Sequence, residues 1–176
     1  MNNLQIGVMG SAADLNYSKN TESIAAKLGT QIAESGNTLI FGAEKDYDSL
    51  STIANRSAKQ AGGITVGITY GKKTPVWDTP TVLIATGVDR GGGREFSLVL
   101  SCDVIICIGG GSGTLTEMLI AYQANIPIVV IDNTGGWSQQ LANSYLDNRK
   151  RLRIELASTP EKAVEMAIKL ARSPQQ

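Results

Sequence analysis

The sequence predicts a Rossmann-like, three-layer α/β/α fold with a mostly parallel sheet. Short apolar runs alternate with longer amphipathic segments along the 176 residues, which is the pattern of a parallel sheet with helices on both faces. The run Val104–Ile108 is continuously apolar, as expected for a strand that is covered on both sides. Since we find no internal repeat, low-complexity segment or domain boundary, we expect residues 1–176 to form a single domain.

Seven short β-rich runs are the predicted strands. They are Leu4–Met9, Asn37–Phe41, Ile64–Ile68, Pro80–Ala85, Val104–Ile108, Ile128–Asp132 and Leu152–Leu156.

Six segments are predicted helices: Thr21–Ser35, Asp48–Ala61, Arg94–Ser101, Thr114–Ala124, Trp137–Leu146 and a last helix that starts at Thr159-Pro160-Glu161. In the first, Ile24, Leu28 and Ile32 recur at helical spacing, and Gly36 stands where a C-terminal cap belongs. Two glycines end the second helix, and the Thr-Pro-Glu sequence favours the start of the last one.

The most informative stretch is residues 109–117, Gly-Gly-Gly-Ser-Gly-Thr-Leu-Thr-Glu, which joins a predicted buried strand to the helix after it. Backbone N–H groups at a helix start lack intrahelical acceptors and lie at the positive end of the helix dipole. Glycine lets such a backbone approach a ligand closely. We therefore expect the amides of residues 110–114 to hold a phosphate or a similar anion.

Further glycines stand at the carboxyl ends of other predicted strands, at Gly10 (with Ser11), Gly42 and Gly87. Ligand sites of open parallel sheets lie at this edge, so we expect these turns to converge on one crevice. The predicted domain would then be nucleotide-binding or phosphate-binding. The candidate ligand-binding residues are Gly10, Ser11, Gly42, Gly109, Gly110, Gly111, Ser112, Gly113 and Thr114.

The glycine loop also has structural interpretations. It contains no Gly-Lys-Ser/Thr of a Walker A sequence, and Thr114 stands where a dinucleotide fingerprint has its third glycine. The loop could form only a tight turn. Thr114 and Glu117 match a capping box, with Thr114 as N-cap and Glu117 at N3, and the sequence supports this role as well as a catalytic one.

Two charged segments are further candidates. Arg94 follows the run Gly91-Gly92-Gly93 at a predicted helix start, where a positive charge opposes the helix dipole. This cost indicates an acidic partner; the alternative is a solvated arginine beside Glu95. The loop Glu44–Asp48 either faces the crevice or is solvated, with Asp48 capping the next helix.

Composition excludes several functions. The 16 Lys+Arg and 16 Asp+Glu residues give a formal net charge of zero, so nothing indicates the basic surface of a nucleic-acid-binding protein. We interpret the basic run Arg149–Arg153 as a solvated helix end. The chain has no histidine, which excludes Ser-His-Asp and Cys-His catalysis and histidine-based zinc sites. Cys102 and Cys107 form no metal motif or disulfide framework, so we expect no metal site.

We expect a cytoplasmic protein without a membrane partner. The N-terminus lacks the charged and apolar parts of a signal peptide, and no apolar run reaches the length of a membrane span.

Residues 109–117 resemble the Pro-Gly-Gly-x-Gly-Thr-x-x-Glu signature of the Lonely Guy family, and Arg94 matches an arginine at the start of that family's preceding helix. The resemblance covers most of the chain and is most specific over residues 94–131. Within this superfamily, the Gly-Gly-Gly-x-Gly-Thr form and Gly135-Gly136-Trp137 are more similar to the molybdenum cofactor carrier branch.

The resemblance to Lonely Guy proteins implies hydrolysis of the N-glycosidic bond of a nucleoside 5′-monophosphate, with Arg94 and Glu117 as catalytic residues. Arg94 would orient Glu117 or the phosphate and keep the carboxylate ionised. Glu117 would bind the ribose hydroxyls and stabilise the cationic sugar.

The resemblance to the carrier branch implies instead a protein that holds molybdenum cofactor, or a related phosphorylated pterin or nucleotide, without catalysis. Neither function requires a further cofactor, and both imply a small phosphorylated ligand and a homodimer or higher homo-oligomer. A third function, DNA binding by similarity to DNA-processing protein A, is disfavoured by the zero net charge.

Two positions depart from the family pattern. Glu95 stands where a basic or amide residue is usual, and the loop Glu44–Asp48 replaces a glycine-rich one. Acidic side chains in this loop would repel a phosphate unless Lys45 offsets them. This departure slightly favours the carrier function, because a storage site tolerates the loss of catalytic geometry.

Overall fold

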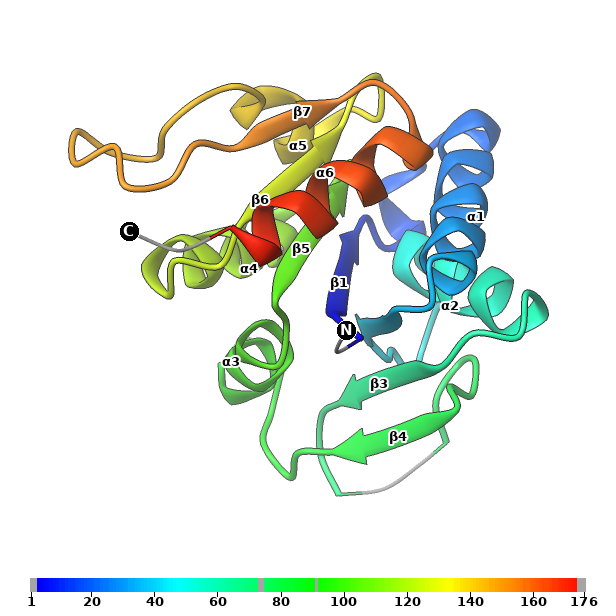
Figure 1. Cartoon of the computed structure of the whole chain (residues 1–176). Coiled ribbons are helices and arrows are strands. Elements are labelled where there is room, and N and C mark those ends of the chain that lie inside the picture. The colour runs from blue at the N-terminus through cyan, green and yellow to red at the C-terminus, as the bar shows by residue number, and fades with distance from the viewer. Residues whose placement is uncertain (1–2, 73–74, 91, 174–176) are drawn as a thin grey trace.

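The computed structural model describes residues 3–72, 75–90 and 92–173. These residues form a seven-stranded sheet in the order β4-β3-β2-β1-β5-β6-β7, in which each neighbouring pair is parallel. The predicted Rossmann-like α/β class is confirmed, and the sheet is wholly parallel (Figure 1). The strands are β1 (Gln5–Gly10), β2 (Thr38–Gly42), β3 (Thr65–Thr69), β4 (Val82–Ala85), β5 (Val104–Ile108), β6 (Ile128–Ile131) and β7 (Glu155–Ala157).

Helices cover both faces of this sheet. Buried apolar side chains of α1, α2 and α6 pack on one face; those of α3 and α4 pack on the other, where partly buried side chains of α5 join them. A 3₁₀ turn, η1, which the sequence pattern does not indicate, lies between β1 and α1. The helical segments are η1 (Ala13–Leu15), α1 (Lys19–Glu34), α2 (Leu50–Gln60), α3 (Gly93–Leu100), α4 (Ser112–Gln123), α5 (Gly136–Leu141) and α6 (Pro160–Arg172).

The strand β5 shows why its sequence is apolar without a break. Val104, Ile106 and Ile108 belong to the apolar layer of α1, α2 and α6, whereas Ile105 and Cys107 belong to the layer of α3 and α4. Strand side chains alternate between faces, so two covered faces demand apolar residues at every position. Each buried valine or isoleucine contributes roughly 1.5–3 kcal/mol.

The strand order reverses between β1 and β5. From β1 the chain continues to β2 on one side of the sheet, whereas β5 leads to β6 on the other. Gly10 at the end of β1 is in register with Ile108 at the end of β5. Loops that leave two such strands diverge, and a crevice opens between them.

The segment between α5 and β7 differs most from its prediction. The helix already ends at Leu141, and the strand begins only at Glu155. Between them, Asn143 has a positive φ of 59°, and the carbonyl of Ser144 accepts from the amide of Ile154 at 2.9 Å. The chain folds back on itself through these contacts, which side-chain periodicity does not report.

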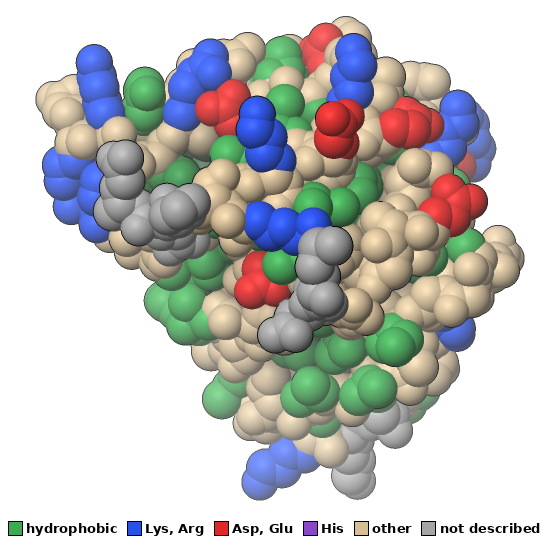
Figure 2. Space-filling view, viewed as in Figure 1, with side chains coloured by type: hydrophobic (Ala, Val, Ile, Leu, Met, Phe, Trp, Pro, Cys, Tyr) green, Lys and Arg blue, Asp and Glu red, His purple; other side chains and the backbone are tan. Residues whose placement is uncertain are grey.

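The basic run Arg149–Arg153 lies in this loop rather than at a helix end. Arg149 is paired with Asp147, and Arg153 with Glu155 at 3.0 Å. Across the upper part of the face in Figure 2, lysine and arginine side chains lie among aspartate and glutamate side chains. Among the residues that the structure describes, no helix combines the length and the apolar character needed to cross a bilayer. The cytoplasmic location, the absence of nucleic-acid partners and the homo-oligomeric state stay predictions.

Candidate functional site

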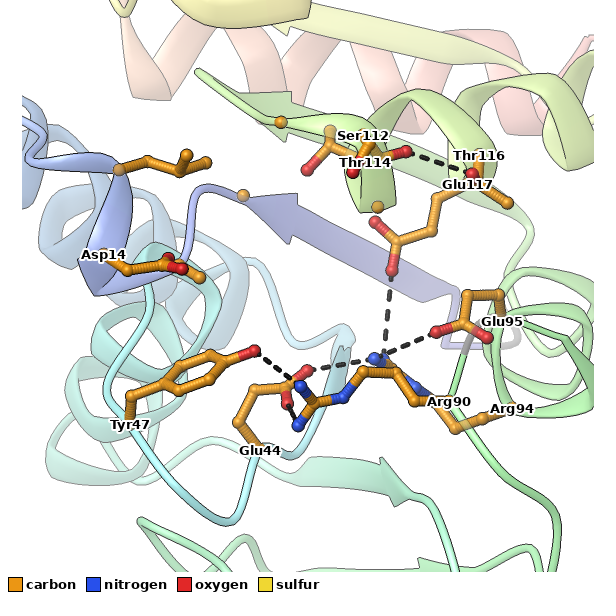
Figure 3. Close-up of a pocket in the computed structure, with 15 residues that line it drawn as sticks. Asp14, Glu44, Tyr47, Arg90, Arg94, Glu95, Ser112, Thr114, Thr116 and Glu117 are labelled. Carbon is orange, nitrogen blue, oxygen red and sulfur yellow. Dashed lines mark hydrogen bonds and ion pairs between the residues drawn. The ribbon is translucent and has the colours of Figure 1, made fainter.

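A cavity of about 380 Å³ lies at the carboxyl edge of the sheet, beside the point where the strand order reverses. Its walls come from η1, the β2–α2 loop, the β4–α3 loop, and the starts of α3 and α4 (Figure 3). The lining residues are Gly10, Ala12, Asp14, Leu15, Glu44, Tyr47, Arg90, Arg94, Glu95, Gly111, Ser112, Gly113, Thr114, Thr116 and Glu117.

The first two glycines of the loop after β5 are held by the protein itself. The amide of Gly109 donates to Oγ1 of Thr134 at 3.0 Å, and the amide of Gly110 donates to Oγ of Ser11 at 2.7 Å. Both glycines have positive φ, 63° and 101°, a conformation that glycine adopts without strain. Neither amide is therefore available to a ligand, and Ser11 fixes the loop instead of facing a ligand.

The start of α4 is open. Gly111 is the N-cap residue, and no side chain of the described residues caps this helix. Ser112, Gly113 and Thr114 carry first-turn amides, which have no acceptor within a helix, and all three residues line the cavity. A Cβ added to Gly113 would meet no other described atom within 4 Å, so the space beside it is unfilled.

The capping box predicted for Thr114 and Glu117 does not form. Because α4 begins at Ser112, Thr114 is the third residue of the helix and Glu117 the sixth, which is too far along the helix to cap it. Glu117 lines the cavity and points from α4 toward Arg94 (Figure 3).

Arg94 is 5% exposed and lies next to three carboxylates. Its Nη2 is 2.9 Å from Oε1 of Glu44 and 3.1 Å from Oε1 of Glu95, whereas its Nη1 is 3.9 Å from Oε1 of Glu117. The predicted acidic partner is present, and the alternative of a solvated arginine is wrong. The contact with Glu117 is longer than a hydrogen bond.

Burial raises the pKa of the Glu117 carboxyl to about 8. The residue is only 8% exposed, and desolvation disfavours the ionised form. Arg94 lowers this pKa, but the charges of Glu95 and Glu44 raise it further. Arg94 thus favours the ionised form of Glu117, as the sequence analysis expects, but burial and the two neighbouring carboxylates oppose it.

Glu95 holds the start of α3. Its Oε2 accepts from the amide of Gly92 at 2.9 Å, while its Oε1 contacts Arg94. Glu95, which departs from the family pattern, thus accepts from a free amide at the helix start and compensates the charge of the buried Arg94. Gly91, from the same glycine run, lies outside the described residues.

Arg90 is a site residue that the sequence analysis does not identify. Its Nη2 donates to Oε2 of Glu44 at 2.9 Å and to the hydroxyl of Tyr70 at 2.6 Å, and its Nη1 donates to the hydroxyl of Tyr47 at 2.9 Å. The guanidinium also lies 4.5 Å from the centre of the Tyr70 ring. Its sequence signal is weak: a second arginine four residues before Arg94.

The loop Glu44–Asp48 faces the cavity through Glu44 and Tyr47. The alternative in which Asp48 caps the next helix is wrong: Ser49 is the N-cap of α2, and Asp48 pairs with Arg56 at 3.2 Å.

A smaller chamber of about 40 Å³ adjoins the main cavity and shares Gly10, Glu44 and Arg94 with it, among others. Gly42 lines this chamber, where an added Cβ would overlap Nη1 of Arg94. Gly42 therefore makes room for the arginine. Gly87 follows the edge strand β4 and is not among the described residues that line the cavity.

The cysteines do not contribute a nucleophile to the site. Cys102 and Cys107 are buried free thiols, and burial raises the pKa of both, which keeps them as unreactive thiols. Within the described ranges, no group of three or more His, Cys, Asp or Glu side chains is arranged to hold a metal ion.

The model of the SLOG cluster4 family matches residues 3–164. The chain belongs to the SLOG cluster4 family. A protein from Archaeoglobus fulgidus is 36% identical over 120 residues, which span 68% of this chain and 74% of that protein.

Three solved structures are similar to this SLOG cluster4 chain over nearly its whole length. The structural-genomics target TM1055 has a TM-score of 0.84 at 29% identity and covers 94% of this chain and 99% of its own. The molybdenum cofactor binding protein of Rippkaea orientalis has a TM-score of 0.79 at 31% identity, covering 97% and 98%. The molybdenum cofactor carrier protein of Chlamydomonas reinhardtii has a TM-score of 0.78 at 26% identity, covering 98% and 100%. The superfamily indicated by the sequence is thereby confirmed.

Proposed function

We propose that this chain binds a small phosphorylated molecule in the cavity at the start of α4. The observation that carries the proposal is the uncapped helix start, which opens onto a cavity of about 380 Å³. The amides of Ser112, Gly113 and Thr114, together with the helix dipole, favour an anion at this place. The ligand's phosphate would lie there, and the rest of the molecule would extend toward Glu44 and Arg94.

We further propose that the ligand is a phosphorylated pterin of the molybdenum cofactor class, carried as cargo. The similar proteins of Rippkaea orientalis and Chlamydomonas reinhardtii are named for this cofactor. The chemistry of the cavity fits such a ligand, because a pterin ring carries several N–H donors and the residues that line the cavity include the carboxyl groups of Glu44, Glu95 and Glu117. A cavity of this volume is in the range that small ligands occupy.

Native mass spectrometry of the freshly purified protein tests this proposal. We expect a mass shift that is lost on denaturation, and a released compound with pterin fluorescence and one phosphate. For protein purified empty, titration with a phosphorylated pterin should give saturable binding. Retention of a nucleotide, together with a failure to bind the pterin, would contradict the ligand class but leave the phosphate site intact.

A second candidate function is nucleoside 5′-monophosphate hydrolysis, favoured by the carboxyl of Glu117 that points into the cavity toward Arg94 at 3.9 Å. An ionised carboxylate is needed to stabilise a cationic sugar, so activity should rise with pH up to about 8, the pKa of Glu117. Release of free base from a panel of nucleoside 5′-monophosphates measures this activity. Glu117→Gln should then lower it by ~10²-fold or more, and no base release from any substrate would leave the binding function alone.

A further inference from the structure

The cavity has two chemically different ends. The amide end is the start of α4, with Ser112 and Thr114 on one side in Figure 3. On the opposite side lies the arginine end, where the side chains of Arg90 and Arg94 approach each other around Glu44. Two guanidinium groups beside a ligand cavity would ordinarily make a strong site for a phosphate or carboxylate.

At the arginine end, one carboxylate of the protein already occupies the place of such an anion. Oε1 of Glu44 accepts from Nη2 of Arg94, and Oε2 accepts from Nη2 of Arg90, both at 2.9 Å. The Glu44 side chain is 12% exposed and lines the cavity, so this contact forms where solvent screens it weakly.

Carboxylates of the protein already compensate the charges at this end. Arg94 has Glu95 as a second close partner at 3.1 Å, and Arg90 lies 3.5 Å from the exposed carboxylate of Asp46, so the two guanidinium charges face Glu44, Glu95 and Asp46. An incoming second anion would have to displace Glu44 or lie beside it. Either event leaves a buried carboxylate without its partner or places like charges together, and both are costly.

We propose that Glu44 is a specificity-determining residue that acts as a built-in anion, closes the Arg90–Arg94 pair to the ligand and restricts the site to molecules with a single phosphate group. This inference rests on the proposed phosphate site at the start of α4. It excludes diphosphates and bisphosphates from ligands that would otherwise fit the cavity.

The test compares two pairs of probes, phosphate with pyrophosphate and fructose 6-phosphate with fructose 1,6-bisphosphate, titrated against the full chain by ³¹P NMR. Pyrophosphate and the bisphosphate differ in the distance between their two phosphate groups. For wild type we expect no preference for the doubly charged member of either pair. Glu44→Gln keeps the size of the side chain and removes its charge, so it should raise the affinity for pyrophosphate or the bisphosphate, measured relative to the singly phosphorylated member of the same pair, by ~10-fold or more.

Asp46→Asn is the matched control. It removes a carboxylate 3.5 Å from Arg90. The Asp46 side chain is 70% exposed and is not among the residues that line the cavity. The variant should therefore show the same relative affinity for the two members of each probe pair as wild type. Adding Arg90→Gln to Glu44→Gln should abolish the gained preference, because the freed guanidinium is then gone. Thermal unfolding of each variant checks its fold, and Glu44→Ser serves if Glu44→Gln proves unstable.

The outcomes separate the two proposals. If Glu44→Gln binds monophosphates as wild type does and gains no preference in either pair, Glu44 is not a built-in anion, while the phosphate site stands. If wild type binds neither monophosphate nor a phosphorylated pterin, the proposed function is overturned, and this inference with it.

Discussion

The starts of α3 and α4 face the same cavity and follow similar glycine runs, yet the protein satisfies them in opposite ways. At α3, Glu95 turns back to accept from the amide of Gly92 and contacts Arg94 at 3.1 Å. At α4, no described side chain caps the helix, and Glu117 lies farther along it, 3.9 Å from the same arginine. The first helix start is completed by its own glutamate, whereas no described side chain caps the second.

A glycine run before a helix therefore does not by itself make an anion site. The deciding feature is the position of the next glutamate along the helix. Glu95 is the third residue of α3 and reaches the helix start, whereas Glu117 is the sixth residue of α4 and cannot. The same residue type therefore caps a helix in one place and becomes a buried acid facing a cavity in the other.

The largest expected effect is the pH dependence that Glu117 gives to the free energy of unfolding. Its pKa is 4.5 when unperturbed and about 8 in the folded protein, so the folded state binds this proton more tightly. The associated stability is fully present below pH 4.5 and is lost as pH rises toward about 8. Urea unfolding of wild type and Glu117→Gln across this range should show wild type losing up to roughly 4 kcal/mol relative to the variant.

Glu165→Gln, a change at an exposed position of α6, is the control and should leave the pH dependence of wild type in place. A difference between wild type and Glu117→Gln that stays constant with pH would mean that Glu117 is ionised in the folded protein.

Closing the open helix start is expected to have the next largest effect. Gly113→Asp places a carboxylate in unfilled space in the first turn of α4, where negative charge favours the helix but repels a phosphate. Affinity for a phosphorylated pterin should fall by about 100-fold, the equivalent of roughly 3 kcal/mol of repulsion, while the thermal midpoint holds or rises. Gly113→Asn, which matches its size without the charge, should lose less, as calorimetric titration can show. Equal binding by the Asp variant and wild type would place the phosphate elsewhere.

Much of this fold follows from the sequence, because a strand buried on both faces needs an unbroken apolar run. Val104–Ile108 is predicted with its ends unchanged. The prediction fails between α5 and β7, where the left-handed Asn143 and the hydrogen bond from Ile154 to Ser144 set the ends of the elements. Such contacts are tertiary, and no local sequence pattern predicts them.

The candidate site is less predictable than the fold, because its hydrogen bonds join residues far apart in the chain. The sequence correctly indicates an acidic partner for Arg94, but Glu44 is 50 residues away, and nothing local links them. Ser11 meets Gly110 across 99 residues, so its hydroxyl is easily mistaken for a ligand contact. The capping box fails for a different reason, since shifting the helix start to Ser112 moves Glu117 out of reach.

A smaller effect is expected from removing the cap of α3. Glu95→Ala removes both the hydrogen bond to the Gly92 amide and the contact with Arg94, and should cost about 2 kcal/mol of unfolding free energy. Glu95→Gln can still accept from the amide and should recover part of this loss, as urea unfolding at neutral pH would show. If the two variants were equally unstable, the cap would contribute nothing, and the contrast between the two helix starts would rest on Arg94 alone.

The smallest effect is expected from removing the two hydroxyls that accept from the amides of the glycine loop before α4. Ser11→Ala leaves the buried amide of Gly110 without its acceptor, and Thr134→Val does the same to Gly109; each should cost about 1 kcal/mol of stability. Affinity for a phosphorylated pterin should fall only modestly and alike in both variants, because each hydroxyl accepts from a loop amide and lies outside the proposed phosphate site. If Ser11→Ala instead lowered affinity steeply with no loss of stability, the Ser11 hydroxyl would be a ligand contact, and the open part of the glycine loop would begin before Gly111.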